Sequence, residues 1–271
     1  MNRNQKLKIK NFCSFIIERK ILIEVIHIVN ETSFPYQWIF TKKGILIEGA
    51  NEDETVLLSI ILHSEDLKQY QYNSDEDNNN NIIILEINTK ILSEQLDIKN
   101  VIISNDNNNN WVKLHFNETN HKIYVYQNNG KQDVIGEFII SKTRKWNNTT
   151  NPKADRKGQI NTTDFRSICT SFTNINVPVF LSIDKSAQVF FSICMIDFKK
   201  FINENKINMI CNENVMIAVD PTYLFFCSNA YTLSTKMYIL IMDQYRFPVR
   251  FKYHFLNKSF LIYYLAPLEN G

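Results

Sequence analysis

The sequence predicts an α+β protein made of two similar domains, each with an antiparallel sheet and two helices. Three observations lead to this class. Short runs rich in Ile, Val, Phe and Tyr recur along the chain, and polar turn clusters separate them. Few segments have the spacing of an amphipathic helix, and a polar stretch near the middle divides the chain into halves of similar content. Short apolar runs between turn residues are typical of antiparallel strands.

The strands are expected where these runs fall. The run from Trp111 to Phe116 also alternates apolar and polar residues, which is typical of a strand with one buried face. Further runs lie at 45–47, 56–62, 82–87, 101–103, 123–126, 180–183, 189–193, 237–242, 249–255 and 260–265. None is long enough to span a bilayer, so no membrane partner is expected. Two Asn-rich tracts, 74–81 and 105–110, are expected to be solvated hairpin loops.

Four helices are expected from spacing and from N-terminal capping residues. The first covers 17–31, where apolar residues recur every three or four positions, and the second covers 89–98. The third begins after the capping cluster Thr162-Thr163-Asp164. The fourth begins at Asp220-Pro221, because proline is favoured at the first position of a helix.

A composition shift at 142–155 separates the two halves. This segment is polar, with one Trp and one Pro, and we interpret it as an interdomain linker. The expected domains are therefore 1–141 and 156–271. Each half then holds two helices and many strands, which indicates an internal repeat.

The chemistry of common enzymes is missing from the sequence. It has no Gly-rich phosphate loop, no HExxH and no GxSxG, and its five histidines lack metal-ligand spacing. The acidic run Asn51 to Glu54 fits a solvated loop better than a metal site. We therefore expect no enzymatic activity, no catalytic residue, no cofactor and no metal. The cysteines Cys13, Cys169, Cys194, Cys211 and Cys227 are widely spaced, which predicts reduced thiols in an intracellular protein.

Overall charge excludes one mode of nucleic-acid binding. The 271 residues contain 30 Lys and Arg against 28 Asp and Glu, a net charge of +2. A protein that holds DNA by overall charge is usually far more basic.

The C-terminal run 247–255 is followed, after a turn, by Leu261-Ile262-Tyr263-Tyr264-Leu265-Ala266-Pro267. This combination resembles the end of proliferating cell nuclear antigen, the sliding DNA clamp of eukaryotes and archaea. The segments 44–51 and 56–67 are similar to the first domain of the clamp, and weaker similarities follow in the correct order at 87–88, 164–169 and 223–234. The resemblance therefore spans nearly the whole chain. It suggests a divergent member, from a virus or from an organism with an AT-rich genome.

The resemblance implies a two-domain clamp fold in which three subunits close a ring, with helices lining the hole and sheets outside. Such a ring is a head-to-tail assembly that closes by rotation. Each joint would pair an edge strand near 121–127 with one near 196–201 of the next subunit. The implied interface residues are Ile123, Tyr124, Val125, Tyr126, Ile196, Phe198 and Phe201. The alternative is that both are ordinary strands of a monomer.

The implied partner of the ring interior is double-stranded DNA, bound without sequence preference. The resemblance points to Arg19, Lys20, Lys90 and Arg166 as the cations that face it. It also reveals departures, because Glu94, Asp97, Ser167, Thr170, Thr222 and Asn229 stand where the family commonly has basic residues. For Arg19 and Lys20 the alternative is a solvated helix face.

The resemblance also implies that partner proteins bind through short peptides with apolar and aromatic anchors. The corresponding pocket would draw on Ala50, Leu57, Trp146, Pro248, Tyr264, Ala266 and Pro267. Trp146 could equally lie against its own sheet.

As a clamp, the protein would be a processivity factor in the nucleus, or at a viral replication site, that serves a DNA polymerase, a clamp loader and repair proteins. The alternative is a clamp-fold viral transcription or checkpoint factor in a hetero-oligomer.

Overall fold

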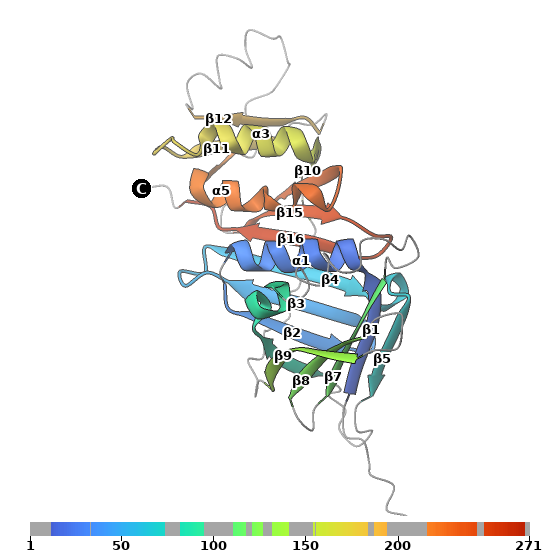
Figure 1. Cartoon of the computed structure of the whole chain (residues 1–271). Helices are drawn as coiled ribbons and strands as arrows, with labels where there is room; N and C mark the ends of the chain where they lie inside the picture. The colour runs from blue at the N-terminus through green and yellow to red at the C-terminus, as the bar shows by residue number, and fades with distance from the viewer. Residues whose placement is uncertain are drawn as a thin grey trace, which may run out of the picture. The chain divides into compact units, whose positions relative to one another are not determined.

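The computed structural model describes residues 12–32, 34–73, 82–94, 111–117, 121–126, 132–140, 154, 156–183, 187–193, 216–242 and 247–268. Antiparallel sheets and a few helices confirm the predicted α+β class (Figure 1). The chain forms two compact units. Unit 1 comprises 1–48 and 61–145, and unit 2 comprises 49–60 and 146–271, so strands β3 and β4 contribute residues to both.

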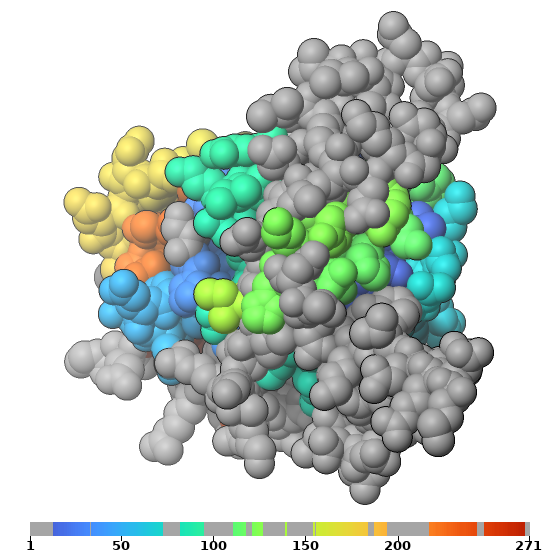
Figure 2. All heavy atoms as spheres, turned by 60° about the horizontal axis from the view of Figure 1, so that its bottom comes forward, coloured from blue at the N-terminus to red at the C-terminus, as the bar shows by residue number. Residues whose placement is uncertain are grey.

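In its described residues, unit 1 is an antiparallel sheet with one long helix and two short helical segments. Its elements are β1 (Phe12–Glu18), α1 (Arg19–Thr32), β2 (Tyr36–Thr41), β3 (Gly44–Ala50), β4 (Val56–His63), η1 (Ser64–Asp66), β5 (Gln69–Asn73), β6 (Ile83–Ile87), helical residues 89–94, β7 (Trp111–Asn117), β8 (Lys122–Tyr126) and β9 (Gln132–Ile140). Its strand order is β4-β3-β2-β6-β9-β8-β7-β1-β5. Figure 2 looks onto β7 and β8 (green), and in the strand order β1 separates β7 from the edge strand β5.

Unit 2 carries two helices that pack side by side (Figure 1). Its elements are β10 (Arg156–Asn161), α3 (Thr162–Phe172), β11 (Val179–Ile183), β12 (Val189–Ser192), β13 (Met216–Val219), α5 (Pro221–Cys227), η2 (Asn229–Thr232), β14 (Lys236–Ile241), β15 (Val249–His254) and β16 (Phe260–Leu265). The strand orders are β10-β14-β15-β16-β4, in which β4 contributes residues 56–60, and β12-β11-β13.

The two units repeat one topology. The order β1-β7-β8-β9 in unit 1 matches β10-β14-β15-β16 in unit 2, and β3-β2-β6 matches β12-β11-β13. Helices follow the matching strands β1 and β10, and again β6 and β13. The last strand of each unit also ends beside a matching strand. Residues 138–140 of β9 pair with β6, and the Leu268 amide, just after β16, donates to the Ala218 carbonyl of β13 at 2.8 Å.

Asp220 caps α5 as predicted, whereas α3 begins at Thr162, inside the predicted capping cluster, and its cap is Asn161. Asn161 accepts a hydrogen bond from the Thr163 amide at 3.0 Å, and Asp220 accepts one from the Thr222 amide at 2.7 Å. These side chains satisfy amides that have no partner inside the helix. The first helix of the chain differs from its prediction, because it begins at Arg19 and not at residue 17. Ile17 belongs instead to β1, whose alternating Cys13, Phe15 and Ile17 are buried.

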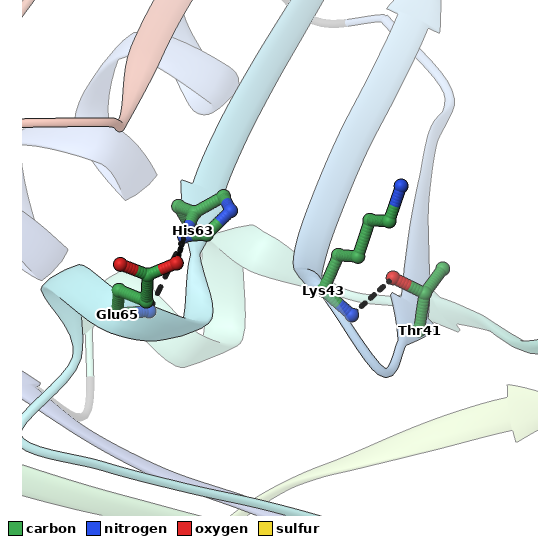
Figure 3. Close-up of polar contacts among 4 residues, drawn as sticks. All are labelled: Thr41, Lys43, His63 and Glu65. Atoms are coloured by element: carbon green, nitrogen blue, oxygen red, sulfur yellow. Dashed lines mark hydrogen bonds and ion pairs between the residues drawn. The ribbon is translucent and has the colours of Figure 1, made fainter.

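A sharp turn joins β2 to β3 in unit 1 (Figure 3). The Lys43 amide donates to Thr41 Oγ1 at 3.1 Å, and the Lys43 carbonyl accepts from the Ser64 amide at 2.9 Å. Next in the chain, Gly44 has a φ of +138°, and a Cβ there would lie 2.1 Å from the Leu62 carbonyl oxygen. Glycine is therefore required at this position. Across the turn, the Glu65 amide donates to His63 Nδ1 at 3.3 Å.

Each unit has an aromatic core. In unit 1, Phe116 contacts Phe40, Phe15 and Trp38 with ring centroids 5.1, 6.1 and 6.5 Å apart. In unit 2, Phe165 of α3 stacks on Phe251 of β15 at 5.4 Å. These rings are almost fully buried, and aromatic pairs of this kind contribute energy beyond their area.

Cys13, Cys169 and Cys227 are buried free thiols, as predicted; Cys194 and Cys211 lie outside the described residues. Within the part of the chain that the structure describes, no helix has the length and apolar character needed to span a membrane. The predicted strand at 101–103 and nearly all of the linker at 142–155 lie outside the described residues.

Candidate nucleic-acid and partner interfaces

Two of the predicted DNA-facing cations lie at the start of α1. Arg19 is half-buried and Lys20 is exposed, and the first turn contains no acidic residue. Because the amino end of a helix already has a partial positive charge, these cations concentrate positive potential there. Lys90 is exposed on the helical residues 89–94. These side chains can contact phosphates without reading bases.

Arg166 has a different setting from the other three. Its Nη1 donates to Ser228 Oγ at 2.9 Å and to Asn229 Oδ1 at 2.6 Å. The guanidinium also lies over the Phe225 ring at 4.0 Å. Arg166 therefore joins α3 to the end of α5, and this structural role was missed by the sequence analysis.

The remaining helix surfaces are weakly charged. Exposed positions on α3 are mainly hydroxyl residues. The described residues of the second helix contain one cation, the exposed Lys90, and one acid, the exposed Glu94. Asp97 lies outside the described residues. The α5 segment from Pro221 to Cys227 contains no charged side chain. The helices of this chain thus provide few cations for a phosphate backbone.

The residues predicted to bind partner peptides all belong to unit 2. Ala50, Leu57, Pro248, Tyr264, Ala266 and Pro267 are all half-buried, while Trp146 lies outside the described residues. The Ala266 amide donates to the Thr55 carbonyl at 2.8 Å, which fixes the C-terminal segment beside the start of β4. Partly exposed apolar side chains on a fixed backbone suit the anchoring of an apolar peptide.

The acidic loop between β3 and β4 is held by its own hydrogen bonds. The Val56 amide donates to Asn51 Oδ1 at 2.9 Å, and the Asn51 amide donates to the Val56 carbonyl at 3.1 Å. Among the described residues, no group of three or more His, Cys, Asp and Glu could hold a metal ion.

The predicted subunit interface needs a correction. The stretch 121–127 was expected to be an edge strand, but β8 pairs with β7 on one side and with β9 on the other. Ile123 and Val125 are buried within the subunit, whereas Tyr124 and Tyr126 are half-buried. The prediction was wrong because the sequence analysis did not recognise the strand at 132–140. Ile196, Phe198 and Phe201 lie outside the described residues.

The sheet of unit 2 also carries a group of cations that the sequence-based prediction did not include. Lys157 lies with its ammonium 3.9 Å from the Tyr238 ring, and Lys252 lies 3.7 Å from the Phe260 ring. Burial, Lys157 and Arg250 together lower the pKa of Lys252. The signal was present in the sequence, because β10, β14, β15 and β16 contain no Asp or Glu.

Two repeats of one α+β topology, joined in one chain, define the fold of the sliding DNA clamps. The crystal structure of Proliferating Cellular Nuclear Antigen from Entamoeba histolytica superposes with a TM-score of 0.69, at 13% identity, over 95% of this chain and 98% of that chain. The protein thus has a clamp fold similar to proliferating cell nuclear antigen. No family model matches the sequence, and no curated protein does.

Proposed function

We propose that the chain is one subunit of a sliding-clamp ring that encircles duplex DNA and tethers other proteins to it. The observation that carries this proposal is the agreement in fold over 95% of the chain, including both repeats. A ring of this kind acts by topology and raises the effective concentration of a tethered polymerase. It needs neither a catalytic group nor base readout.

The internal repeat supports ring closure. In unit 2, β16 has β15 on one side and residues 56–60 of β4 on the other. The matching strand of unit 1, β9, pairs with β8 along one side and with β6 at its end. At the place that β4 takes beside β16, no described strand pairs with β9. In unit 1, β4 is the strand that follows β3, and β12 is the counterpart of β3 in unit 2. The counterpart of β4 is therefore expected in the residues after β12, and in a second copy of the chain that segment would pair with β9. That segment includes Ile196, Phe198 and Phe201. Pairing of this kind is head-to-tail and protects an edge strand from aggregation.

The oligomeric state tests closure. Light scattering after size-exclusion chromatography should give a mass near three times 32.0 kDa. Ile139 of β9 is 66% exposed in the single chain, so Ile139→Glu should dissociate the ring by placing a charge at the joint. Ile82→Glu is the matched control, because Ile82 is 54% exposed and lies before β6. A stable wild-type monomer would contradict the homotrimer and favour the hetero-oligomeric alternative.

Contacts inside the ring would be loose. Arg19, Lys20 and Lys90 supply cations at helix surfaces that otherwise carry few, and Arg166 is already bound to Ser228 and Asn229. A topological link does not depend on strong attraction, so few phosphate contacts suffice. The salt dependence of DNA association should accordingly be shallow.

Encirclement can be tested without a loader. The protein is threaded onto linear duplex DNA tethered at one end, and the other end is then blocked with streptavidin. A ring should stay through a high-salt wash and leave when a restriction enzyme cuts the DNA. Arg19→Glu/Lys20→Glu should lower the amount threaded and leave the oligomeric mass unchanged. Retention after cutting would show direct binding, and absence of retention would contradict encirclement.

Tethering would use the apolar residues around Tyr264 and Ala266, which are half-buried beside the backbone link to Thr55. Partners would be a DNA polymerase, a loader and repair proteins with short anchoring peptides. Primer extension by the cognate polymerase on circular DNA should give longer products with the protein than without it. A fluorescent fusion should concentrate in the nucleus, or at replication sites in a virus-infected cell.

A further inference from the structure

The sheet of unit 2 has a cationic and aromatic face that the clamp fold does not explain. We call the set Lys157, Tyr238, Arg250, Lys252, His254 and Phe260 the basic face. These residues occupy alternate, same-side positions of β10, β14, β15 and β16. The register pairs Tyr238 with Lys252, and His254 with Phe260.

Ring contacts connect these residues into one cluster. The His254 ring lies 5.9 Å from Tyr238 and 5.7 Å from Phe260, edge-on to the first. The Lys157 ammonium lies over Tyr238, and the Lys252 ammonium lies over Phe260. Cation–π contacts hold both lysine side chains flat against the sheet, so their charges have defined positions.

The charge of this face is unusual because its four strands contain no acidic residue. Lys157, Lys236, Arg250 and Lys252 lie on the same side of the sheet, whereas the register places Arg156 on the opposite side. Among the described residues, neither Lys157 nor Lys252 forms an ion pair. Arg250 is only 7% exposed and lies close enough to Lys252 to repel its charge. Partly desolvated cations that repel one another favour an anion that binds across them.

The residues next to the basic face indicate what kind of anion binds there. Arg250 lies directly opposite Tyr264 in the β15–β16 register, and two residues after Tyr264 the chain reaches Ala266 and Pro267. These are the residues that the proposed function assigns to the peptide anchor. A chain anchored there by apolar side chains would continue over Arg250 and Lys252. The aromatic rings would pack against its backbone and side-chain methylenes.

We propose that the basic face binds an acidic segment of a partner protein, directly adjoining the apolar anchor of the same peptide. The proposal rests on the proposed tethering function and specifies its partner class: peptides with two or more Asp or Glu residues beside an apolar-aromatic turn. The apolar anchor provides affinity, and the basic face selects partners by charge and speeds their association.

Peptide selection tests this directly. A random 16-residue peptide library displayed on phage is selected against the full-length protein, in parallel with two variants. Lys157→Gln/Lys252→Gln removes two cations of the basic face. Lys113→Gln/Lys122→Gln removes two from the sheet of unit 1, where the Lys113 ammonium also lies over a tyrosine ring, 5.2 Å from Tyr126. Selected sequences are then synthesised with the acidic residues intact or replaced by Asn and Gln.

The wild type and the unit 1 variant should select peptides that join an apolar-aromatic anchor to an acidic flank. Lys157→Gln/Lys252→Gln should keep the anchor preference and lose the acidic one. In fluorescence anisotropy, replacing the acidic flank should weaken binding to the wild type about tenfold. The same replacement should change binding to Lys157→Gln/Lys252→Gln less than twofold, and the difference should shrink in high salt.

Other outcomes separate the two proposals. Anchor peptides without acidic enrichment would overturn the basic-face proposal and leave tethering intact. No peptide binding at all would count against both the tethering function and the acidic flank. A fluorescent 20-nucleotide single strand is the remaining probe: if it binds the wild type, loses affinity in Lys157→Gln/Lys252→Gln and competes with no peptide, the face serves nucleic acid instead.

Discussion

Units 1 and 2 have the same strand order but differ in charge on matching strands. The strands β1, β7, β8 and β9 of unit 1 contain Glu18, Asp133 and Glu137 together with Lys113 and Lys122. Their counterparts in unit 2 contain five Lys and Arg residues and no acid. Topology follows from which positions are buried, and exposed positions can change charge without altering it. The charge of unit 2 is therefore not a requirement of the fold.

The units also link their two helices differently. In unit 1 Asn30 Nδ2 donates a neutral hydrogen bond to the Thr89 carbonyl at 3.2 Å. In unit 2 the Arg166 guanidinium contacts two side chains and an aromatic ring. A residue expected to face DNA is thus partly used to brace a helix pair. The following predictions compare matched positions in the two units.

The largest expected effect comes from the aromatic cores. Phe116→Ala should lower the free energy of unfolding by ~3–5 kcal/mol, because the cavity would adjoin Phe15, Trp38 and Phe40. Phe165→Ala should cost a similar amount in unit 2. Denaturant titration gives the magnitudes, and hydrogen exchange resolved by segment shows where protection falls. Equal loss of protection in both units from either change would contradict separate cores.

Two glycines should differ in their tolerance of alanine. Gly44→Ala in unit 1 should cost ~2–4 kcal/mol, because the new Cβ meets backbone and φ is positive. In unit 2, a Cβ at position 158 would lie 2.4 Å from Val189 Cγ2. Because the Val189 side chain can shift, Gly158→Ala should cost about 1–2 kcal/mol. Chemical denaturation of both variants gives the order, and a reversed order would show that the turn before β3 can relax.

A buried hydroxyl should contribute more in unit 2 than a half-buried one in unit 1. Tyr253 Oη donates to the Cys227 carbonyl at 2.6 Å with both residues fully buried, so Tyr253→Phe should cost about 1–2 kcal/mol. Tyr70 Oη donates to the Thr41 carbonyl at 2.7 Å, and Tyr70 is half-buried. Water can therefore take the place of the missing hydroxyl and donate to this carbonyl in Tyr70→Phe. Thermal unfolding should therefore shift less for Tyr70→Phe.

The smallest effect concerns two histidines on the exposed sheet faces. In unit 1, burial and the charge of Lys113 lower the pKa of His115 below the ordinary value of 6.5. In unit 2, burial and the charges of Lys252 and Lys157 lower the pKa of His254 in the same way. The folded state then binds fewer protons than the unfolded state, so stability is present above pH 6.5 and declines as pH falls below it. His254→Gln should flatten this decline between pH 7 and pH 5. Lys252→Gln should raise the pKa of His254 in a proton NMR titration, and an unchanged value would contradict the contact.

Much of the fold could be read from hydrophobic periodicity and capping residues. Asp220-Pro221 marked the start of α5 correctly, because capping is local chemistry. The cluster at Thr162 indicated the third helix but not its cap, which is Asn161. The strand at 132–140 was missed because its pattern is interrupted by Gly136 and Glu137. Missing it placed the edge of the sheet at β8, which in fact pairs with β7 on one side and with β9 on the other.

The site residues divide in the same way. Lys20 and Lys90 are exposed on helices, as a sequence pattern can suggest, while the contacts of Arg166 join residues more than sixty positions apart. No local sequence pattern can indicate a contact between residues so far apart in the chain. The basic face likewise requires four strands to be placed side by side before its charges meet.

Composition and order along the chain determined the α+β class, the repeat and the resemblance to sliding clamps, because burial periodicity and capping act over a few residues. Only the tertiary structure decided which strands lie at an edge, that Arg166 braces two helices, and that Lys157, Arg250 and Lys252 share one face. Those properties depend on strand register and on contacts between distant segments, and the free energy of such contacts exists only after the chain has folded.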